Sequence, residues 1–538
     1  MGIYLNSGNT GFERALNSKI YVDKTDMIAL LMKRINTEQS CICMSRPRRF
    51  GKSVTANMIA AYFDKSCDSR MLFEGRKLGN AEHWDRYLNQ FNVIKLDIAD
   101  FRARTDNAES ALEYISDVLF EELSEAFPDV ALERKREPAG WLALIHEKKG
   151  EQFVIIIDEW DCLFRDDAED KNGQEKYISF LRSLFKGDNS KRFLALAYIT
   201  GILPVKRYRS ESALNNFSEC TMLSPKEFAP YIGFTTEEVK KLCSEYDMDY
   251  EQALEWYDGY NLGEHEHICG ANSVALAMYY RNFESYWSQT IAFDSLKGYI
   301  TLNYEGLKDD IIQMIGGQKV KVRTRTFQND TTSIGSKDDV MTLLIHLGYL
   351  AYDADTQLAY IPNKEVREYF EDTLEAAGWD GLVEAIEDSR RLLAATIEGN
   401  TVETARMIER CHGENTSIIK YNDENSLAAC LAIAYYSARS EYMIIREMPA
   451  GYGFADMVFL PKRNVTKPAM IVELKWNKNA DTAISQIREK KYVQALKGYE
   501  GEVLLVGISY DKNGKDEKKH FCVIERIHLK KINKVLDK

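Results

Sequence analysis

The sequence has no run of about 18 apolar residues, the length that a helix needs to cross a membrane. Its first residues lack the charged and apolar segments of a secretion signal, so we expect a cytoplasmic protein without a membrane partner. None of its ten cysteines forms a Cys-x-x-Cys pair or joins histidines at zinc spacing. We therefore expect buried, reduced thiols rather than a zinc site.

Internal repeats and low-complexity segments are also missing, which excludes a solenoid. The net charge is −13, which excludes a surface that is basic all over and binds nucleic acid by charge alone. Charge is uneven, however, since residues 511–538 hold nine Lys and Arg against five Asp and Glu. That segment could follow a phosphate backbone, but a solvated helical face explains it at least as well.

Strand-like and helix-like segments alternate through the first half of the chain. The expected strands are 40–44, 92–98, 153–157 and 193–199, and the expected helices are 53–63 and 110–127. Such alternation predicts an α/β fold with a parallel sheet that helices cover on both faces. After about Pro204 the pattern changes, and residues 225–256 are mostly helix-like.

The middle of the chain predicts a helix at 337–347, a hairpin from 348–352 and 357–361, and a helix from Lys364. This order is compatible with a small winged-helix-like module. Such modules contact DNA or dock proteins, and the sequence leaves both uses open. Residues 379–410 look like a helical linker, and a second α/β pattern begins near Tyr421.

A candidate phosphate-binding loop lies between the first expected strand and helix. Gly51, Lys52 and Ser53 fit the end of a GxxxxGK[ST] loop, in which the N-terminus of a helix attracts phosphate. Lys52 would reach the β- and γ-phosphates, Ser53 would ligate Mg²⁺, and Arg48, Arg49 and Phe50 would complete the nucleotide contact. Arg46 stands where the motif has its first glycine, and Pro47 lacks an amide donor. A basic turn that opens a helix would explain this segment alone.

An apolar strand ending in two carboxylates, Asp158 and Glu159, supplies the second half of the expected nucleotide site. Asp158 would hold Mg²⁺ through water, and Glu159 would orient or deprotonate the attacking water. A buried strand with an acidic exit loop is common, but the two motifs together favour a nucleotide site. Thr200 ends the next strand and either senses the γ-phosphate or begins a turn. Arg207 and Arg209 could each act as an arginine finger, although solvated surface is favoured.

At this point the chain resembles a known family. Residues 21–25 (Tyr-Val-Asp-Lys-Thr), 46–53 and 256–260 (Trp-Tyr-Asp-Gly-Tyr) resemble the AAA-ATPase-like proteins of bacteria and archaea, which usually carry a C-terminal PD-(D/E)XK nuclease-superfamily domain. Arginine at the first loop position is a feature of that family. Residues 215–216 and 361–367 are also similar, so the resemblance covers nearly the whole chain.

The resemblance implies that Asp23 and Lys24 lie near the nucleotide end of the first domain. It also implies that residues 256–260 belong to a helical lid. The chain departs from the family at 269–273, where it reads Cys-Gly-Ala-Asn-Ser instead of Tyr-Asn-Pro-x-Ser.

A second acidic constellation lies in the C-terminal part. Asp456 is near the start of one expected strand, and Glu473 and Lys475 are two apart on the next, so they share a face. Antiparallel pairing can bring Asp456 beside Glu473, and clustered oxygens suit Mg²⁺ or Mn²⁺. The metal would activate water, while Lys475 would position that water or stabilise charge on the phosphate. An exposed strand with alternating charges would look the same, and Glu447 is a rival for the upstream acid.

The surrounding order supports the nuclease interpretation. Expected helices at 424–437 and 480–496 flank the two strands, and strands at 501–510 and 520–527 follow. This order matches the nuclease core. By resemblance, Glu424 and Gln486 occupy the places of a glutamate and a glutamine that this superfamily often carries on its first and second helices.

We therefore predict an α/β protein in four parts. They are an AAA-like P-loop ATPase core at 1–205, a helical lid at 206–295, a winged-helix-like and helical linker region at 296–410, and a PD-(D/E)XK nuclease-like domain at 411–538. The expected function is ATP binding and hydrolysis coupled to metal-dependent cleavage of nucleic acid, DNA rather than RNA, with a homo-oligomer compatible. The alternative is an ATP-driven switch whose nuclease-like fold is inactive and only binds a partner.

Overall fold

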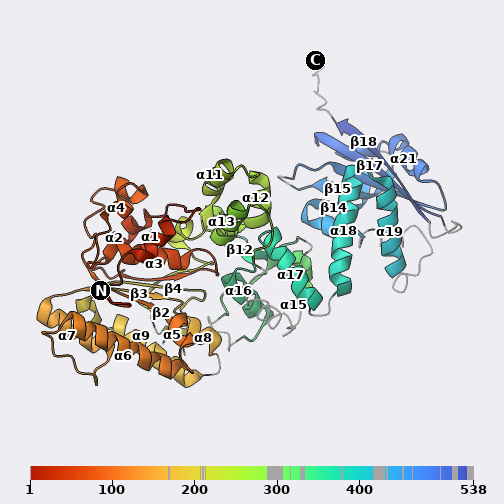
Figure 1. Cartoon of the computed structure of the whole chain (residues 1–538). Coiled ribbons are helices and arrows are strands. Elements are labelled where there is room, and N and C mark those ends of the chain that lie inside the picture. The colour runs from red at the N-terminus through yellow and green to blue at the C-terminus, as the bar shows by residue number, and fades with distance from the viewer. Residues whose placement is uncertain are drawn as a thin grey trace, which may run out of the picture. The chain divides into compact units, whose positions relative to one another are not determined.

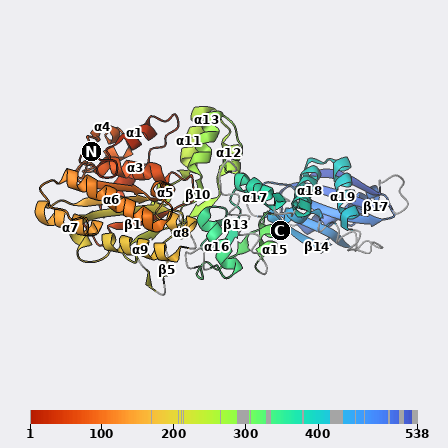
Figure 2. The same ribbon diagram turned by 60° about the horizontal axis from the view of Figure 1, so that its bottom comes forward.

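The computed structural model describes residues 2–529 with the exception of 168–169, 206, 209–210, 213, 264, 288–303, 305–306, 316, 328–333, 377–379, 416–430, 432–433, 451–452, 463–464, 497–498 and 512–518. The chain forms two compact units, 1–308 with 320–369 and 309–319 with 370–538 (Figures 1 and 2). Among the described residues, no helix has both the length and the apolar composition to cross a membrane.

The first unit contains a five-stranded sheet in the order β2-β3-β4-β1-β7. Its strands are β1 Cys41–Ser45, β2 Asn92–Asp97, β3 Phe153–Asp158, β4 Leu194–Gly201 and β7 Ser218–Cys220. Every neighbouring pair is parallel, which confirms the predicted sheet. β1, β3 and β4 are buried along their whole length, as their apolar sequences require in a sheet covered on both faces. β4 lies between β1 and β3, so the loops after these strands meet at one edge.

Helices cover both faces of this sheet (Figure 1). One side carries α1 Thr10–Leu16, α2 Met27–Met32, α3 Lys52–Phe63, α4 Arg70–Phe73 and the 3-10 turn η1 Lys77–Asn80. The other helices are α5 Ile98–Ala103, α6 Ala108–Ala126, α7 Pro138–Lys149, α8 Cys162–Asp166, α9 Lys171–Phe185 and α10 Ser190–Phe193, and a two-stranded hairpin, β5 Arg207–Tyr208 and β6 Glu211–Ser212, follows β4. α6 shows why these helices pack here. A capping box at Asn107 and Ser110 starts it, and its buried side chains recur every three or four residues.

Residues 226–287 form what we call the lid segment. Its elements are η2 Lys226–Tyr231, β8 Phe234–Thr235, α11 Thr236–Tyr246, α12 Tyr250–Tyr257, β9 Tyr260–Leu262, β10 His265–Cys269 and α13 Ala271–Tyr280. A capping box of Thr235 and Glu238 starts α11. The small sheet β8-β10-β9 was not expected from the sequence, because strands of two to five residues give too short a pattern.

Residues 320–376 form what we call the winged-helix-like segment. It contains β11 Val320–Lys321, α16 Lys337–Leu347, β12 Ala351–Asp353, β13 Leu358–Tyr360 and α17 Lys364–Ala376, with sheet order β11-β13-β12. The predicted helix, hairpin and helix are confirmed. Gly348 ends α16 with φ +86°, the left-handed conformation that glycine adopts at low cost.

The second unit contains a five-stranded sheet in the order β14-β15-β16-β17-β18. Its elements are α15 Leu307–Ile315, α18 Asp380–Glu398, α19 Thr401–Asn415, η3 Tyr436–Ser440, β14 Tyr442–Ala450, β15 Gly453–Pro461, β16 Ala469–Trp476, α21 Ala480–Glu489, η4 Tyr492–Leu496, β17 Gly501–Tyr510 and β18 His520–Leu529. The boundary between the units falls within α15 and α17. Only β16 and β17 pair in parallel, and the other neighbours are antiparallel.

Two apolar cores lie on opposite faces of this sheet. One contains α18, α19 and η3 side chains, and the other contains α21 and η4 side chains. The expected helix 480–496 ends early at Glu489, because Lys491 adopts a left-handed φ of +53° before η4 begins. The expected helix 424–437 lies largely outside the described residues.

Candidate functional sites

The loop between β1 and α3 has the backbone of a phosphate-binding turn. Gly51 caps α3 at φ +97°, and the first amides of α3 have no helical acceptor. Lys52 is 5% exposed, and its Nζ donates to the Pro47 carbonyl at 3.0 Å across the loop. Burial lowers the pKa of Lys52, although Glu159 and Asp158 oppose that shift. The loop therefore holds one buried ammonium group above the start of the helix.

Two side chains at the carboxyl edge of the sheet form a pair suited to a divalent ion. Asp158 is 2% exposed at the end of β3, and Ser53 lies near its carboxylate. Burial raises the pKa of Asp158, and the nearby Ser53 hydroxyl works against that rise. A serine hydroxyl beside an aspartate is the oxygen set that holds Mg²⁺ in P-loop enzymes, so these residues fit the ion.

Glu159 follows Asp158 in a strained conformation between two cations. Its φ is +48°, which non-glycine residues adopt rarely and mostly at functional sites. Arg165 donates to its carboxylate at 2.6 Å, and Lys52 Nζ lies 3.7 Å from it. Glu159 is thus oriented from both sides beside the Ser53–Asp158 pair.

The other expected residues near this edge of the sheet are either fully buried or without a described side chain. The Thr200 hydroxyl is fully buried and has no hydrogen-bond partner among the described residues. Arg46 is also fully buried, and it donates to the carbonyls of Ser45 and Cys220 at 2.9 and 3.2 Å. Burial lowers its pKa to about 10. Arg207 lies in β5 with its side chain not described, and Arg209 lies outside the described residues.

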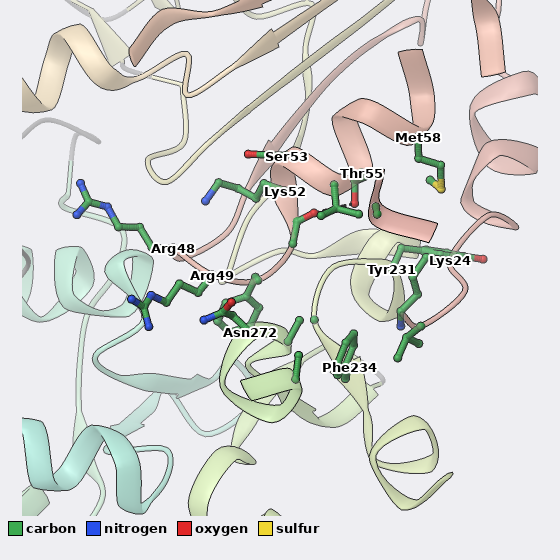
Figure 3. Close-up of a pocket in the computed structure, with 18 of the residues that line it drawn as sticks. Lys24, Arg48, Arg49, Lys52, Ser53, Thr55, Met58, Tyr231, Phe234 and Asn272 are labelled. Atoms are coloured by element: carbon green, nitrogen blue, oxygen red, sulfur yellow. Dashed lines mark hydrogen bonds between the residues drawn. The ribbon is translucent and has the colours of Figure 1, made fainter. Parts of the chain in front are cut away.

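A cavity of about 560 Å³ extends from the loop to the lid segment (Figure 3), a volume typical of small-molecule sites. Its polar lining includes Arg48, Arg49, Lys52, Ser53, Glu159 and Arg165 beside the loop. Its apolar lining includes Phe12, Tyr21, Met58, Tyr231 and Phe234, with Lys24 beside Tyr231 and Phe234 (Figure 3). The cavity therefore offers most of its charge beside the loop and flat aromatic surface toward the lid segment.

The segment 21–25 lies at this cavity, and its Lys24 and Asp23 side chains hold it in place. Lys24 lines the cavity and donates to Glu238 Oε2 and to the Pro230 carbonyl, both at 2.5 Å. Asp23 accepts from Thr25 and from the Lys77 amide. Lys24 thus attaches the N-terminal loop to α11, and Asp23 shapes the turn that presents it.

The second site lies where β15 and β16 part. Met457 is the first residue of β15 that pairs with β16, opposite Val472. Asp456 directly precedes it, at the point where the two strands are no longer paired. The Asp456 carboxylate accepts the Leu474 amide at 2.7 Å, so the structure places it beside Glu473. Glu473 is 2% exposed, and Lys475 Nζ donates to its Oε1 at 2.9 Å. The three residues expected from the sequence are thus brought together.

Two side chains from α21 and η4 complete this cluster. Gln486 donates to Glu473, and also to the Tyr492 hydroxyl at 3.0 Å. Burial raises the pKa of Tyr492, and the negative charges of Glu473 and Asp456 raise it further. Glu447 lies in β14 with its side chain not described, and Glu424 lies outside the described residues.

The donor set fits an oxygen-bound divalent ion with water in the remaining positions. Two carboxylates from adjacent strands supply the hard ligands that Mg²⁺ and Mn²⁺ prefer. Within the described ranges there is no group of three or more His, Cys, Asp and Glu side chains placed to hold a metal. Mg²⁺ usually keeps several waters and takes only one or two protein carboxylates.

Comparison with known families agrees with both clusters. Residues 8–209 match the family described as Predicted AAA-ATPase, and residues 423–519 match the PD-(D/E)XK nuclease superfamily. The chain thus combines an AAA-ATPase-like region with a C-terminal PD-(D/E)XK nuclease-superfamily region. Families of both kinds generally use a nucleotide or a divalent metal. Below, the two regions are called the ATPase domain and the nuclease-superfamily domain.

Individual relatives are distant. The "Uncharacterized protein in vnfD 5'region" of Azotobacter chroococcum mcd 1 is 24% identical to this chain over 276 residues. The match covers 50% of this chain and 50% of that protein, so the chain spans about half the length of this curated relative. Among solved structures, the Aeropyrum pernix ORC2 protein in its ADPNP–ADP complexes is 11% identical with a TM-score of 0.31, covering 69% of this chain and 98% of that one. The ADP form of that protein is 9% identical with a TM-score of 0.28, and the coverage of the two chains is the same.

Several side chains at the two sites were not singled out from the sequence. Arg165 orients Glu159, and only its position six residues after this acid could have indicated that role from the sequence. Asp97 ends β2 opposite Asp158, which an apolar strand ending in Asp could have indicated. Tyr492 follows Gln486 beyond a turn that the sequence did not reveal, and Asn272 reaches the ATPase cavity from α13.

Proposed function

We propose that the ATPase domain binds and hydrolyses ATP. The observation that carries this proposal is the placement of Lys52 Nζ at 3.7 Å from Glu159, next to the buried Asp158 at the carboxyl edge of a parallel sheet. Ser53 and Asp158 would hold Mg²⁺, which would offset the negative charge of the phosphates. Lys52 would move from the Pro47 carbonyl to the phosphates, and Glu159 would orient the attacking water.

The cavity supports a nucleotide rather than free phosphate. Phosphates would lie against Lys52 and Ser53 at the start of α3, where helix amides attract anions. The aromatic lining at the other end, Tyr21, Tyr231 and Phe234, provides flat surfaces against which a base can stack.

Replacement of Lys52 tests the ATP proposal. Lys52→Ala removes the buried ammonium, and we expect a loss of about 3 kcal/mol in ATP affinity, roughly a hundredfold. Isothermal titration with ATP and Mg²⁺ measures it. Lys149→Ala, an exposed lysine on α7, is the matched control and should bind as the native chain does. Unchanged affinity in Lys52→Ala would contradict the proposal.

We propose further that the nuclease-superfamily domain cuts nucleic-acid phosphodiesters with Mg²⁺ or Mn²⁺. The convergence of Asp456, Glu473, Lys475 and Gln486 carries this proposal. The two carboxylates would hold the ion, which activates water, and Lys475 would stabilise charge on the phosphate. DNA is the expected polymer.

Cleavage assays with single- and double-stranded DNA and RNA test the nuclease proposal. Asp456→Asn should lower metal-dependent cleavage by about 10²–10³-fold, the usual cost of losing one preorganised electrostatic contact. Asp481→Asn, an exposed aspartate in the first turn of α21, is the control. If Asp456→Asn still cleaves nucleic acid, the catalytic site lies elsewhere in the chain. Lack of any cleavage by the native chain would favour the switch with an inactive nuclease-like fold.

A further inference from the structure

The phosphate loop is attached to the lid segment by its own backbone. The Gly233 amide donates to the Phe50 carbonyl, and the Asn272 amide donates to the Arg49 carbonyl, both at 3.0 Å. The Phe50 ring meets the Tyr260 ring edge-on at 5.2 Å between centroids. Residues 49–50 of the phosphate loop are therefore attached to the lid segment as well as to the sheet.

A buried carboxylate stands behind these attachments. Glu365, on the first turn of α17, is 2% exposed. Its Oε1 accepts the Ser273 hydroxyl at 2.9 Å and the Tyr286 amide at 2.8 Å, and its carboxylate also accepts the Trp287 amide. Ser273 lies on α13, directly after Asn272. One carboxylate thus gathers three donors from the lid segment.

Arg49 completes the connection to the loop. Its guanidinium donates to the Tyr286 carbonyl, and it attracts Glu365 electrostatically. Tyr286 is therefore held at both ends, with its amide on Glu365 and its carbonyl on Arg49. Arg49 also lines the cavity and has φ +69°, an unfavourable conformation that surrounding contacts must maintain.

We propose that Glu365 is a positioning residue of the nucleotide site. It acts through Tyr286 on Arg49 and through Ser273 on α13, and so fixes the phosphate loop and the lid segment together around the cavity. This inference rests on the proposed ATP site. A buried carboxylate costs free energy unless it is well bonded, and an apolar side chain would fill the same space at less cost. Its hydrogen bonds described above all lead to the lid segment, and Arg49 of the loop attracts it.

Protonation of Glu365 gives the proposal a second observable. Burial raises its pKa to about 7, while its three donors and Arg49 act in the opposite direction. The other titratable groups facing it, Tyr257, Tyr260 and Tyr286, stay neutral because burial raises their pKa values. The anionic form, which binds the donors and attracts Arg49, therefore dominates above about pH 7. The uncharged form dominates below that pH and holds the loop less firmly.

A double-mutant cycle tests this relay in the full-length chain. ATP affinity is measured by titration calorimetry for the native chain, Glu365→Gln, Arg49→Met and the double variant. We expect each single change to weaken ATP binding about tenfold, within the range of site–site coupling. The double variant should be no weaker than the worse single variant, because both changes break one path.

Measurement at about pH 6 and about pH 8 separates positioning from simple structural support. The native chain should lose affinity at the lower pH by more than Glu365→Gln does, and this comparison cancels titration of ATP itself. Ser273→Ala, which removes one donor, should give a smaller loss in the same direction. Glu368→Gln, on the same helix, is the control and should match the native chain.

Each result decides between the two proposals. Multiplying losses in the double variant, or a Glu365→Gln chain that only melts earlier while binding ATP normally with an unchanged pH response, would overturn the inference. If Glu365→Gln fails to fold, Ser273→Ala and the pH response of Arg49→Met carry the same decision. A native chain that does not bind ATP would overturn the proposed function instead, since Lys52→Ala would then have no effect to show.

Discussion

Both candidate sites set a lysine against a glutamate near the carboxyl end of a strand, but they assign the proposed roles differently. In the ATPase domain, Lys52 bonds to the Pro47 carbonyl and lies 3.7 Å from Glu159, which Arg165 also orients. The candidate metal ligand there is a separate residue, Asp158. In the nuclease-superfamily domain, Glu473 alone accepts both Lys475 and Gln486.

This difference teaches which functions can be separated by mutation. In the ATPase domain, the proposed ion ligand and the proposed water-orienting base are neighbouring residues, so each can be replaced by itself. In the nuclease-superfamily domain, the proposed metal ligand also fixes the lysine. A change at Glu473 should therefore affect metal binding and charge stabilisation together.

The largest effect is expected from Glu473→Gln. Cleavage should fall by about 10³–10⁴-fold, at the upper end of losses for one catalytic carboxylate, because two functions fail at once. The response to added Mn²⁺ should disappear as well, while ATP hydrolysis continues. Glu502→Gln, a half-exposed carboxylate on β17 paired with Arg526, is the matched control in the same assay.

The comparison would fail if Glu473→Gln kept its response to Mn²⁺ and lost only rate. That result would place the metal on Asp456 and other oxygens, and Glu473 would then serve to hold Lys475.

A smaller and more selective effect is expected from Glu159→Gln. The rate of ATP hydrolysis should fall by about 10²–10³-fold, because a water-orienting base is lost while the phosphate contacts remain. ATP affinity by calorimetry should stay near the native value. Glu151→Gln, just before the other end of β3 and paired with Lys65, is the control. Equal losses of affinity and rate would show that the two acids act as one unit, as in the other domain.

The sequence predicted those parts of the sites that are local. Gly51, Lys52 and Ser53 adjoin one strand and one helix, and Asp158 and Glu159 end another, so strand order in a parallel sheet brings them to one edge. The pair of β15 and β16 is a hairpin, so Asp456 and Glu473 could also be expected to meet. The first-half strands agree with the predicted ranges to within two residues.

The connections between segments could not be read in the same way. The hydrogen bond from Ser273 to Glu365 joins residues that are 92 positions apart. Neither segment has a sequence pattern that predicts contact with the other. Tyr492 was missed because the turn at Lys491 broke the expected helix and moved later residues to a new direction. Arg46 fits the family pattern, but only the structure showed that it packs against Cys220 instead of facing phosphate.

The smallest effect is expected from Tyr492→Phe. This variant tests whether the catalytic contribution comes mainly from Glu473 or is shared with Tyr492. The change removes the hydroxyl that accepts from Gln486 at 3.0 Å and leaves the ring in its apolar surroundings. Loss of one such bond is worth about 1 kcal/mol, so cleavage should fall roughly fivefold. Tyr499→Phe, whose hydroxyl donates to the Glu502 carbonyl away from the carboxylates, is the control. If Tyr492→Phe instead matched Glu473→Gln, the tyrosine would belong to the reacting groups, and the domain would divide its work as the ATPase domain does.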